Sequence, residues 1–518
     1  MGGGLLQLVA YGAQDAYITG NPHITFWKVL YKRHTNFAME AFRVNFTGSP
    51  QYGQRVVAVV NRNADLMYKT YLEVQLPDTQ TAGVKWSAAW ERRLGYQLLK
   101  KVEVEIGGQI IDTHYGEWLF LWENLTSGFD NSVKLDSMTG GYLGGSTTTN
   151  VSCGGRPAIL YIPLQFWFCR NPGLALPLIA LQYHEVRINV TLAPATDLVT
   201  AATPGTTTVS AAAASLPQLK DMSLYIDYIY LDVDERRRFA QQSHEYLIDQ
   251  LQFGLQQTLT TSSARIDLTL NHPVKELVWV FQDARKTDCG SDLTKNMGFT
   301  QPFSYDDIVN RCRLQINGQD RFDERYGDYF WRVQPYQHHS GGAFWPMRAQ
   351  ATAVGSTTVT ATGCSAVGDV LTVPTGQPGS GFIIEGAVVS SGTLFAPGTV
   401  VSAFGTGSGG SGTYNISEPI LAATSSTFTV TFTLPNLQYT PHENPINVYS
   451  FALQPEEHQP SGTCNFSRID TTTLVFDSIT TKDLAKPTKT TPFNFRMYAV
   501  NYNIFRVMSG MGGLAYSN

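Results

Sequence analysis

The feature that most constrains the fold is an internal repeat at an offset of 210 residues. Arg55–Asn61 reads RVVAVVN, and 210 residues later Arg265–Asn271 reads RIDLTLN. The same offset places the IGGQ sequence at 106–109 on the INGQ sequence at 316–319, and after a slip of one residue YGEW at 115–118 corresponds to YGDY at 326–329. Matches that recur in order at a nearly constant offset indicate two copies of one domain.

Both halves contain short segments rich in Val, Ile, Tyr and Thr, often with alternating apolar and polar residues, which is typical of β-strands. These segments are 54–60, 70–76, 101–106, 185–192 and 224–232 in the first half, and 264–270, 276–281, 312–316, 448–453, 466–476 and 494–507 in the second. The GGQ and NGQ triplets favour tight turns because Gly accepts a positive φ. About eight strands in roughly 200 residues per half favour a two-sheet β-sandwich over an α/β fold.

Few segments predict helices. One is expected near 22–33, where Asn21 can cap, Pro22 can occupy the first turn, and apolar residues share a face. Short helices are also expected after the two turns, around 115–123 and 326–332.

Three long connections are expected, at 124–157, 193–218 and 338–446. The last contains a block at 349–433 that is nearly free of charge and rich in Gly, Ser, Thr and Val. Alternating runs within it favour a small inserted β module over a disordered linker.

Charged residues make up only 15% of the chain and aromatic residues 12%. So little charge predicts that much of the surface contacts other protein. A net charge of −5 without a dense basic run argues against direct nucleic-acid binding. The longest apolar stretches are interrupted by Arg170-Asn171 and by prolines, and the first residues lack a signal-peptide pattern, so a soluble protein with reduced cysteines is expected.

The sequence offers no arrangement typical of catalysis. It lacks GxSxG and HExxH motifs, and the Gly-rich 405–413 stretch is not followed by the Gly-Lys-Ser/Thr of a phosphate-binding loop. His338-His339 is the only adjacent histidine pair, and with no third ligand nearby it is expected to be a solvated loop pair rather than a metal site. We therefore expect no catalytic residue, no metal, no cofactor and no enzymatic activity.

Six Asn-x-Ser/Thr sequons are present. Three fall in or beside expected strands and should be inaccessible: Asn45, Asn189 and Asn465. Three are expected in loops and are candidates for glycosylation: Asn124, Asn150 and Asn415.

Several long, specific strings are spread over nearly the whole chain: GGLLQLVAYGAQDAYITGNPHITFWKVLYKRHTNFAME (3–40), NPGLALPLIALQYHEV (171–186), RRRFAQQSHEYLIDQLQF (236–253), INGQDRF (316–322), PSGTCNFSRID (460–470) and YNIFRVMSGMGGLAYSN (502–518). These strings resemble the major capsid protein family of the nucleocytoplasmic large DNA viruses, the algal-virus and giant-virus group. The block at 349–433 has no counterpart in that resemblance.

The resemblance implies an all-β fold of two tandem eight-stranded jelly rolls with short helices. Its boundaries here would be an assembly arm at 1–40, a first roll at 41–236, and a second roll at 237–518 interrupted by the 349–433 module. In the arm, Phe26, Trp27, Leu30 and Tyr31 would offer an apolar face to a partner.

The same resemblance implies the function of a late structural protein of the virion. Homotrimers would form pseudo-hexagonal capsomers that tile an icosahedral shell, assembled in the host cytoplasm. The expected partners are neighbouring capsomers, minor capsid proteins and an internal viral membrane beneath the shell, with the long loops facing outward toward a host surface.

Two other classes remain open from the residues alone. A glycan-binding lectin-like or tail-fibre protein also uses β-sandwiches and Gly/Thr-rich modules, and a jelly-roll enzyme is a third class. A lectin would cluster exposed aromatics with carboxylates or Asn in one loop, and the sequence contains no such cluster.

Overall fold

The structure is a computed structural model. It describes residues 3–76, 88–90, 93–140, 159–201, 218–261, 263–283, 305, 307–341, 344–345, 358–377, 383, 387–391, 394–395, 399, 401–406, 410–417, 427–433, 442–443, 445–479 and 493–516.

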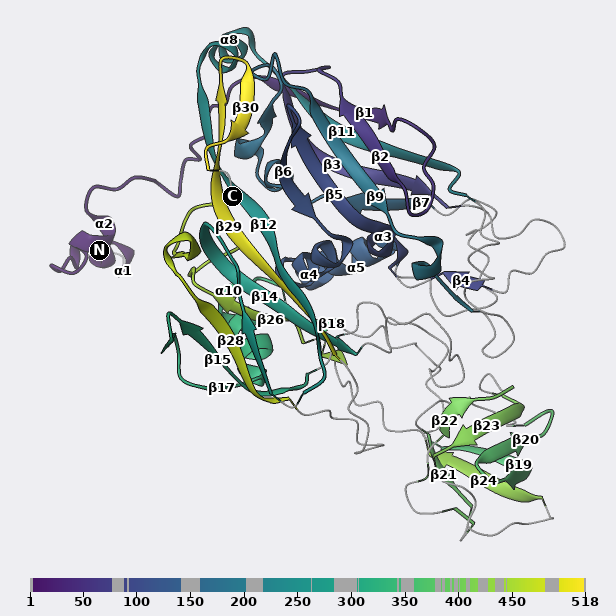
Figure 1. The fold of residues 1–518 in the computed structure, drawn as a ribbon. Coiled ribbons are helices and arrows are strands. Elements are labelled where there is room, and N and C mark those ends of the chain that lie inside the picture. Colours follow the sequence, from purple (N-terminus) through teal and green to yellow (C-terminus); the bar gives the residue numbers. More distant parts are fainter. Residues whose placement is uncertain are drawn as a thin grey trace.

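The first half forms two antiparallel sheets that face each other (Figure 1). One sheet has the order β1 (Phe37–Asn45), β11 (Asp221–Leu231), β3 (Leu66–Gln75) and β7 (Ile159–Pro163), with β8 (Leu176–Pro177) also pairing β3. The other has the order β2 (Arg55–Val60), β9 (Val186–Leu192), β5 (Leu99–Ile106) and β6 (Gln109–His114). A short pair, β4 (Ala88–Trp90) with β10 (Val199–Ala201), stands apart.

The second half repeats this order strand by strand. Its first sheet runs β12 (His244–Leu259), β29 (Phe493–Met508), β14 (Pro273–Asp283) and β26 (Asn447–Ser450), with β27 (Cys464–Asn465) pairing β14 and β30 (Met511–Leu514) pairing β29. Its second sheet runs β13 (Ala264–Asp267), β28 (Thr472–Ile479), β15 (Val309–Ile316) and β16 (Gln319–Asp320), with β17 (Arg325–Tyr326) pairing β15. Each half is therefore an eight-stranded jelly roll, and the duplication read from the sequence is a duplication of topology.

The repeated turns occupy equivalent places in the two rolls. Gly107 and Gly108 join β5 to β6, and Asn317 and Gly318 join β15 to β16. All four have positive φ, from 49° to 85°. Two consecutive left-handed residues reverse a hairpin with the correct twist, which is why Gly and Asn stand there.

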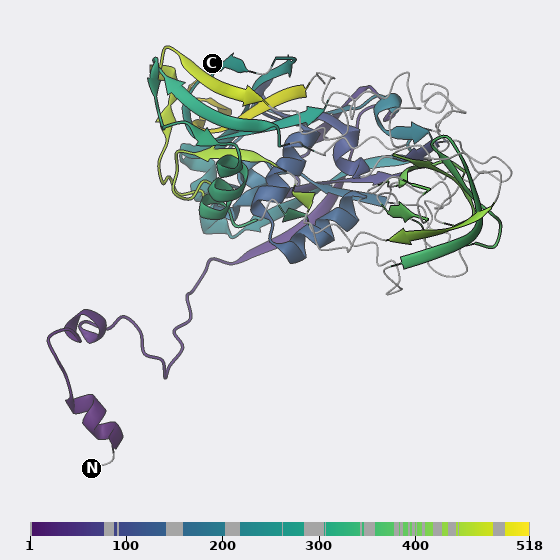
Figure 2. The same ribbon diagram turned by 90° about the horizontal axis from the view of Figure 1, so that it is seen from below.

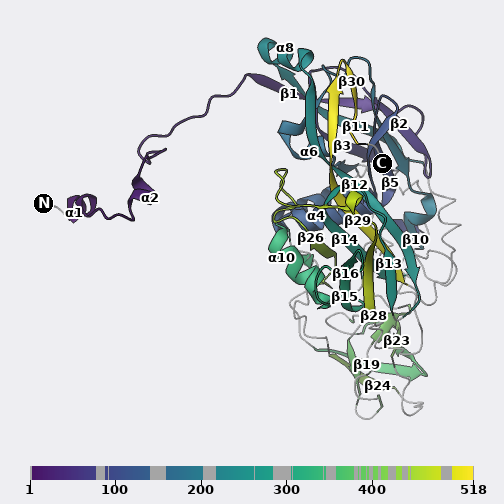
Figure 3. The same ribbon diagram turned by 60° about the vertical axis from the view of Figure 1, so that its left-hand side comes forward.

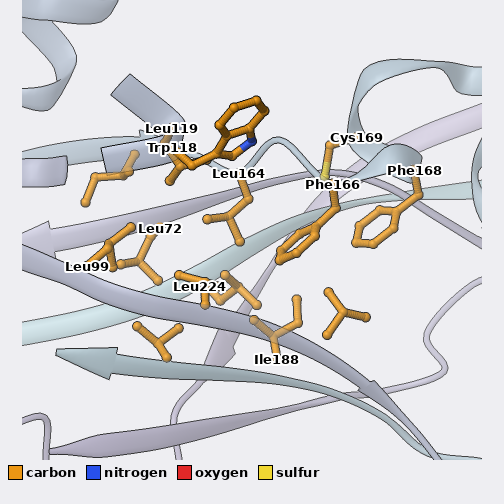
Figure 4. Close-up of a cluster of buried hydrophobic side chains, with 14 of the residues drawn as sticks. Leu72, Leu99, Trp118, Leu119, Leu164, Phe166, Phe168, Cys169, Ile188 and Leu224 are labelled. Carbon is orange, nitrogen blue, oxygen red and sulfur yellow. The ribbon is translucent and has the colours of Figure 1, made fainter. Parts of the chain in front are cut away.

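Each roll has an apolar core between its sheets. Figure 4 shows the first core, with Leu72 and Leu224 from one sheet, Ile188 from the other, and Leu164 and Phe166 beside them. Two strands of the sheet β12–β29–β14–β26, β14 and β29, are largely buried on both faces. Alternate residues such as Leu277, Trp279 and Phe281 enter the core of the second roll. Their neighbours Val278, Val280, Tyr498 and Val500 join the core of the first roll instead. Because successive side chains of a strand point to opposite faces, a nearly continuous apolar sequence joins the two rolls into one block.

Helices cover the ends of the rolls. They are α3 (Leu94–Leu98), α4 (Gly116–Thr126), α5 (Phe129–Thr139), α6 (Trp167–Arg170) and α8 (Val233–Gln241) in the first half, and the π-helical turn η3 (Tyr329–Val333) with α10 (Gln334–His338) in the second; short 3-10 turns are η1 (Pro172–Leu174), η2 (Ala195–Asp197) and η4 (Phe466–Arg468). The expectation of short helices after both turns is confirmed.

The expectation of a plain connection at 124–157 is wrong in its first part. Helix α4 continues to Thr126, and α5 occupies Phe129–Thr139 before Gly140 ends it with φ +88°. A left-handed Gly is a common helix stop. Helix α8 also spans the expected boundary between residues 236 and 237.

The inserted block contains its own sheet, with the order β21 (Val388–Ser390), β24 (Phe428–Thr433), β19 (Thr358–Val367), β20 (Val370–Val373), β23 (Gly412–Ile416) and β22 (Val401–Phe404). Its buried side chains form a separate core. Before and after the block, β18 (Phe344–Trp345) pairs with β25 (His442–Glu443), which keeps the two ends of the insertion together.

The segment ahead of β1 extends away from the rolls (Figures 2 and 3). It contains α1 (Gly3–Val9) and α2 (Ala16–Thr19), but no helix at 22–33, so that expectation is wrong. The β-branched and aromatic residues between Ile24 and Tyr31 have low helix propensity, and no packing partner compensates for it. Strand β1 begins at Phe37, inside the range assigned to the arm.

Candidate functional site: the roll junction and the arm

A carboxylate of α4 in the first roll is buried against the second roll. Glu117, whose side chain is 14% exposed, lies 2.6 Å from Nη2 of Arg496 in β29. It also accepts hydrogen bonds from the hydroxyls of Tyr498 at 2.6 Å and Tyr305 at 3.1 Å. Burial and then the Glu117 charge raise the pKa of both tyrosines well above the usual value, so both hydroxyls keep the proton that they donate.

The hairpin between β29 and β30 reaches back to the first roll. Ser509 and Gly510 form its turn with positive φ. The amide of Tyr183 donates to the carbonyl of Gly510 at 3.0 Å, and Nδ1 of His184 lies within 3.2 Å of the Gly512 amide and carbonyl. The contacts of His184 with Gly512 join residues 328 positions apart in the chain, so the end of the second roll is bound to the first roll.

A lysine inside β14 belongs to a second buried ionic group. The Lys275 side chain is 0% exposed, and its Nζ lies 3.4 Å from Asp249 in β12 and donates to the Glu457 carbonyl at 3.2 Å. Burial lowers the pKa of Lys275, and the Asp249 charge opposes this. Arg170 of α6 lies 3.3 Å from Asp249, so the group also crosses from one roll to the other.

The neighbouring residue on β14 is paired with a buried histidine. Glu276 and the ring of His339 are both 0% exposed, and Nε2 lies 3.0 Å from a Glu276 oxygen. On its other side, Nδ1 of His339 lies 3.0 Å from Glu456. Burial alone would lower the pKa of His339, but the two carboxylates outweigh it and raise the pKa to about 9. The imidazole is therefore a cation at neutral pH, and the expectation that His338-His339 is a solvated pair is wrong for His339.

The residues after His339 attach to the first roll. The Ser340 hydroxyl donates to Glu456 at 2.6 Å and lies 3.0 Å from the Thr126 carbonyl oxygen, and the Gly341 amide donates to the Leu125 carbonyl at 2.8 Å. Both carbonyl groups belong to the last turn of α4, where backbone carbonyls have no hydrogen-bond donor within the helix. The His339 cluster thus holds the segment that caps α4 from the second roll.

The sequence carried a signal for this cluster. Lys275 and Glu276 interrupt the apolar run of PVKELVWVFQD in β14, and charges in a strand with both faces buried require partners. The partners, His339, Asp249 and Glu456, are far away in sequence, and only the fold brings them together.

The four residues expected to act in the arm are all highly exposed: Phe26 at 88%, Trp27 at 94%, Leu30 at 66% and Tyr31 at 87%. None contacts the rolls closely enough to be buried. The structure thus leaves them available to a partner but does not join them into a helical face.

Most of the predictions about the accessibility of the sequons are wrong. Asn124 is 3% exposed within α4, and its amide donates to the Phe120 carbonyl at 2.7 Å, so the expectation of an accessible loop site is wrong. Asn415 is half-buried within β23, again not in a loop, and Asn150 lies outside the described residues. Asn189 is buried, whereas Asn45 and Asn465 are exposed, contrary to expectation.

Within the described residues, no three His, Cys, Asp or Glu side chains are grouped to bind a metal ion. The helices described for this chain include none long and apolar enough to cross a bilayer.

Two jelly rolls of identical strand order, fused into one block, define the class of double jelly-roll coat proteins. The chain matches the family model "Major capsid protein N-terminus" over residues 25–232 and the model "Large eukaryotic DNA virus major capsid protein" over residues 235–344 and 414–513. It is 41% identical to the major capsid protein of Pyramimonas orientalis virus and 34% identical to that of Paramecium bursaria Chlorella virus 1, with both chains covered completely in each case.

Solved structures agree. A chain of the PBCV-1 virus capsid matches with a TM-score of 0.63 and 30% identity over 95% of this chain and 100% of that one. The Faustovirus major capsid protein shares the fold, with a TM-score of 0.59 and 12% identity over 96% of this chain and 94% of that one. The chain belongs to the large eukaryotic DNA virus major capsid protein family. It is a structural protein of the virion's outer shell and not an enzyme.

Proposed function

We propose that three copies of the chain form a homotrimeric capsomer with a pseudo-hexagonal outline, and that these capsomers tile an icosahedral shell. The proposal includes minor capsid proteins and an internal membrane beneath the shell, assembly in the host cytoplasm late in infection, and no direct contact with nucleic acid.

The observation that supports this most is the repeated strand order. Two rolls of one topology in each chain give six similar units around a threefold axis, and such units can meet six neighbours in a closed lattice. The junction described above keeps the two rolls in one orientation, which a repeating lattice requires. The low charge of the chain also suits extensive contacts between copies.

The two ends of the molecule support one orientation of the capsomer. The inserted module lies at one end of the molecule, and the arm leaves at the opposite end, beside β1 and α8 (Figures 1 and 3). We assign the module to the outer surface, where it can contact a host, and the arm at 1–40 to the base, where it acts in assembly.

Native mass spectrometry at micromolar concentration tests the trimer. The expected species has three times the 57.1 kDa mass of the chain. A stable monomer that is retained on immobilised glycans would instead support the lectin alternative.

The same measurement on truncated chains tests the arm. Removing residues 1–20 should leave the trimer intact and impair shell formation, because α1 and α2 contribute no buried residue. As a control, removing residues 1–46 also deletes β1, whose Val44 belongs to the first core, and should prevent folding. Loss of folded protein on the shorter truncation would contradict the proposed role.

A further inference from the structure

Residues 23–34 of the arm combine aromatic, aliphatic and basic side chains that face solvent. The six large apolar side chains in this segment are each at least 66% exposed: Ile24, Phe26, Trp27, Val29, Leu30 and Tyr31. The segment has no helix or strand, so these side chains are not gathered into one stripe. Contiguous exposed apolar residues of this extent mark a binding surface.

The charge of the segment has one sign. Lys28, Lys32 and Arg33 are positive, and no Asp or Glu occurs between Asp15 and Glu40. A binding partner of this segment therefore carries negative charge and also accepts aromatic rings.

We propose that residues 23–34 bind an anionic lipid surface, with the aromatic rings at the level of the headgroups and the three cations on lipid phosphates and carboxylates. Trp and Tyr favour that level of a bilayer because their rings are amphipathic. Basic residues beside Trp, Phe and Leu are the composition of segments that lie in the interface. The inference rests on the proposed function, which places the arm at the base of the shell.

Two observations favour lipid over a protein groove. Two of the three cations are Lys, a residue depleted in protein interfaces. In addition, many protein grooves bind a defined face of a helix or an added strand, and this segment forms neither. Its irregular backbone also sets the depth of binding, because unpaired amides and carbonyls cannot enter the hydrocarbon region. The segment therefore lies on the membrane and does not span it.

The test is flotation of the full chain with vesicles, in its native oligomeric state. Vesicles of phosphatidylcholine and phosphatidylserine in equal amounts should carry the protein, and vesicles of pure phosphatidylcholine should not. Replacing Lys28, Lys32 and Arg33 by Gln should weaken binding roughly a hundredfold, since each cation near an anionic surface contributes about one kcal/mol. High salt should have the same effect.

Matched variants control for general effects of charge and apolar surface. Lys134, Lys220 and Arg237 are exposed cations of the rolls, and their replacement by Gln should leave flotation unchanged. Trp27→Ser should reduce flotation, whereas Tyr336→Ser, which removes a side chain 88% exposed on α10, should not.

The inference is overturned if the wild-type chain does not float with the anionic vesicles, or if the control variants lose as much binding as the arm variants. It is also overturned if the arm variants change only the mass of the assembly, since the arm then binds another protein chain. Native mass spectrometry of the same samples separates this result from a failure of the proposed function: a monomer refutes the trimer, and flotation can still be scored.

Discussion

Replacing His339 by Gln removes the only positive charge that contacts the buried Glu276 within 4 Å among the described residues. The glutamine can retain the hydrogen bond to Glu456, so the change is mainly one of charge. The substitution should weaken the attachment of Ser340 and Gly341, in the second roll, to the last turn of α4. His338→Gln is the matched control, because among the described residues the half-buried His338 ring has one polar contact, between its Nδ1 and the Leu453 carbonyl at 3.1 Å, and no contact with a carboxylate.

The magnitude follows from the pKa. The folded protein raises the pKa of His339 from 6.5 to about 9, so the folded state binds the proton more tightly than the unfolded state. At about 1.4 kcal/mol per pKa unit, the protonated ring contributes roughly 3 kcal/mol. That stabilisation is complete below about pH 6.5 and is lost as the pH rises through about 9. Breaking a buried ion pair by removing one partner costs a similar amount, about 3–5 kcal/mol.

The assay is thermal unfolding followed by tryptophan fluorescence at fixed protein concentration, because assembly makes Tm depend on concentration. A cooperative unit of about 150–250 residues changes Tm by ~2–4 °C per kcal/mol, so His339→Gln should lower Tm by roughly 6–12 °C near pH 6. The difference from the wild type should shrink toward about pH 10, where the wild-type ring is neutral as well. The double variant with Glu276→Gln should lose less than the sum of the single variants.

A Tm difference that is equally large at both ends of this pH range would refute the reasoning, since the loss would then come from packing and not from charge. An unchanged Tm would refute it too, as would an equal effect of His338→Gln.

Three further predictions concern other parts of the block. Burial raises the pKa of Glu123 to about 7, against the lowering effects of the Tyr96 hydrogen bond and Arg93. The folded state then holds a proton that the unfolded state releases, so stability falls as the pH rises from about 4.5 through 7, and Glu123→Gln should exceed the wild type in unfolding free energy by up to ~3 kcal/mol near pH 8. Gly341→Ala should reduce the unfolding free energy by about 1–3 kcal/mol and lower Tm, because the added Cβ would lie 2.4 Å from the Leu125 carbonyl oxygen, whereas Gly4→Ala, with nothing within 4 Å of the added Cβ, should not. Replacing 349–433 by a short Gly-Ser linker should preserve trimers and Tm, because the module has its own core; loss of trimers on native mass spectrometry would place the module in the interface.

Sequence alone determined the features that depend on local chemistry and on repetition. The turn positions could be predicted because Gly and Asn are the residues that readily accept two consecutive positive φ values there. The repeat predicted that the two halves share one fold. The inserted module was readable from its alternating runs and its lack of charge. The helix expected at 22–33 failed because a sequence pattern predicts a helix only where something packs against its apolar face.

Tertiary structure decided everything that depends on distant partners. The sequence of β14 shows that Lys275 and Glu276 need counter-charges, but Asp249 and His339 reach them only through the folding of both rolls. Asn124 follows the sequon rule and is nevertheless buried, because it lies in α4, whose last turn is covered by Ser340 and Gly341 of the second roll. The pKa of His339 likewise has no sequence signature, since burial and two remote carboxylates set it. Local patterns fix backbone conformation through short-range sterics, whereas burial and charge pairing arise from contacts between residues far apart in the chain.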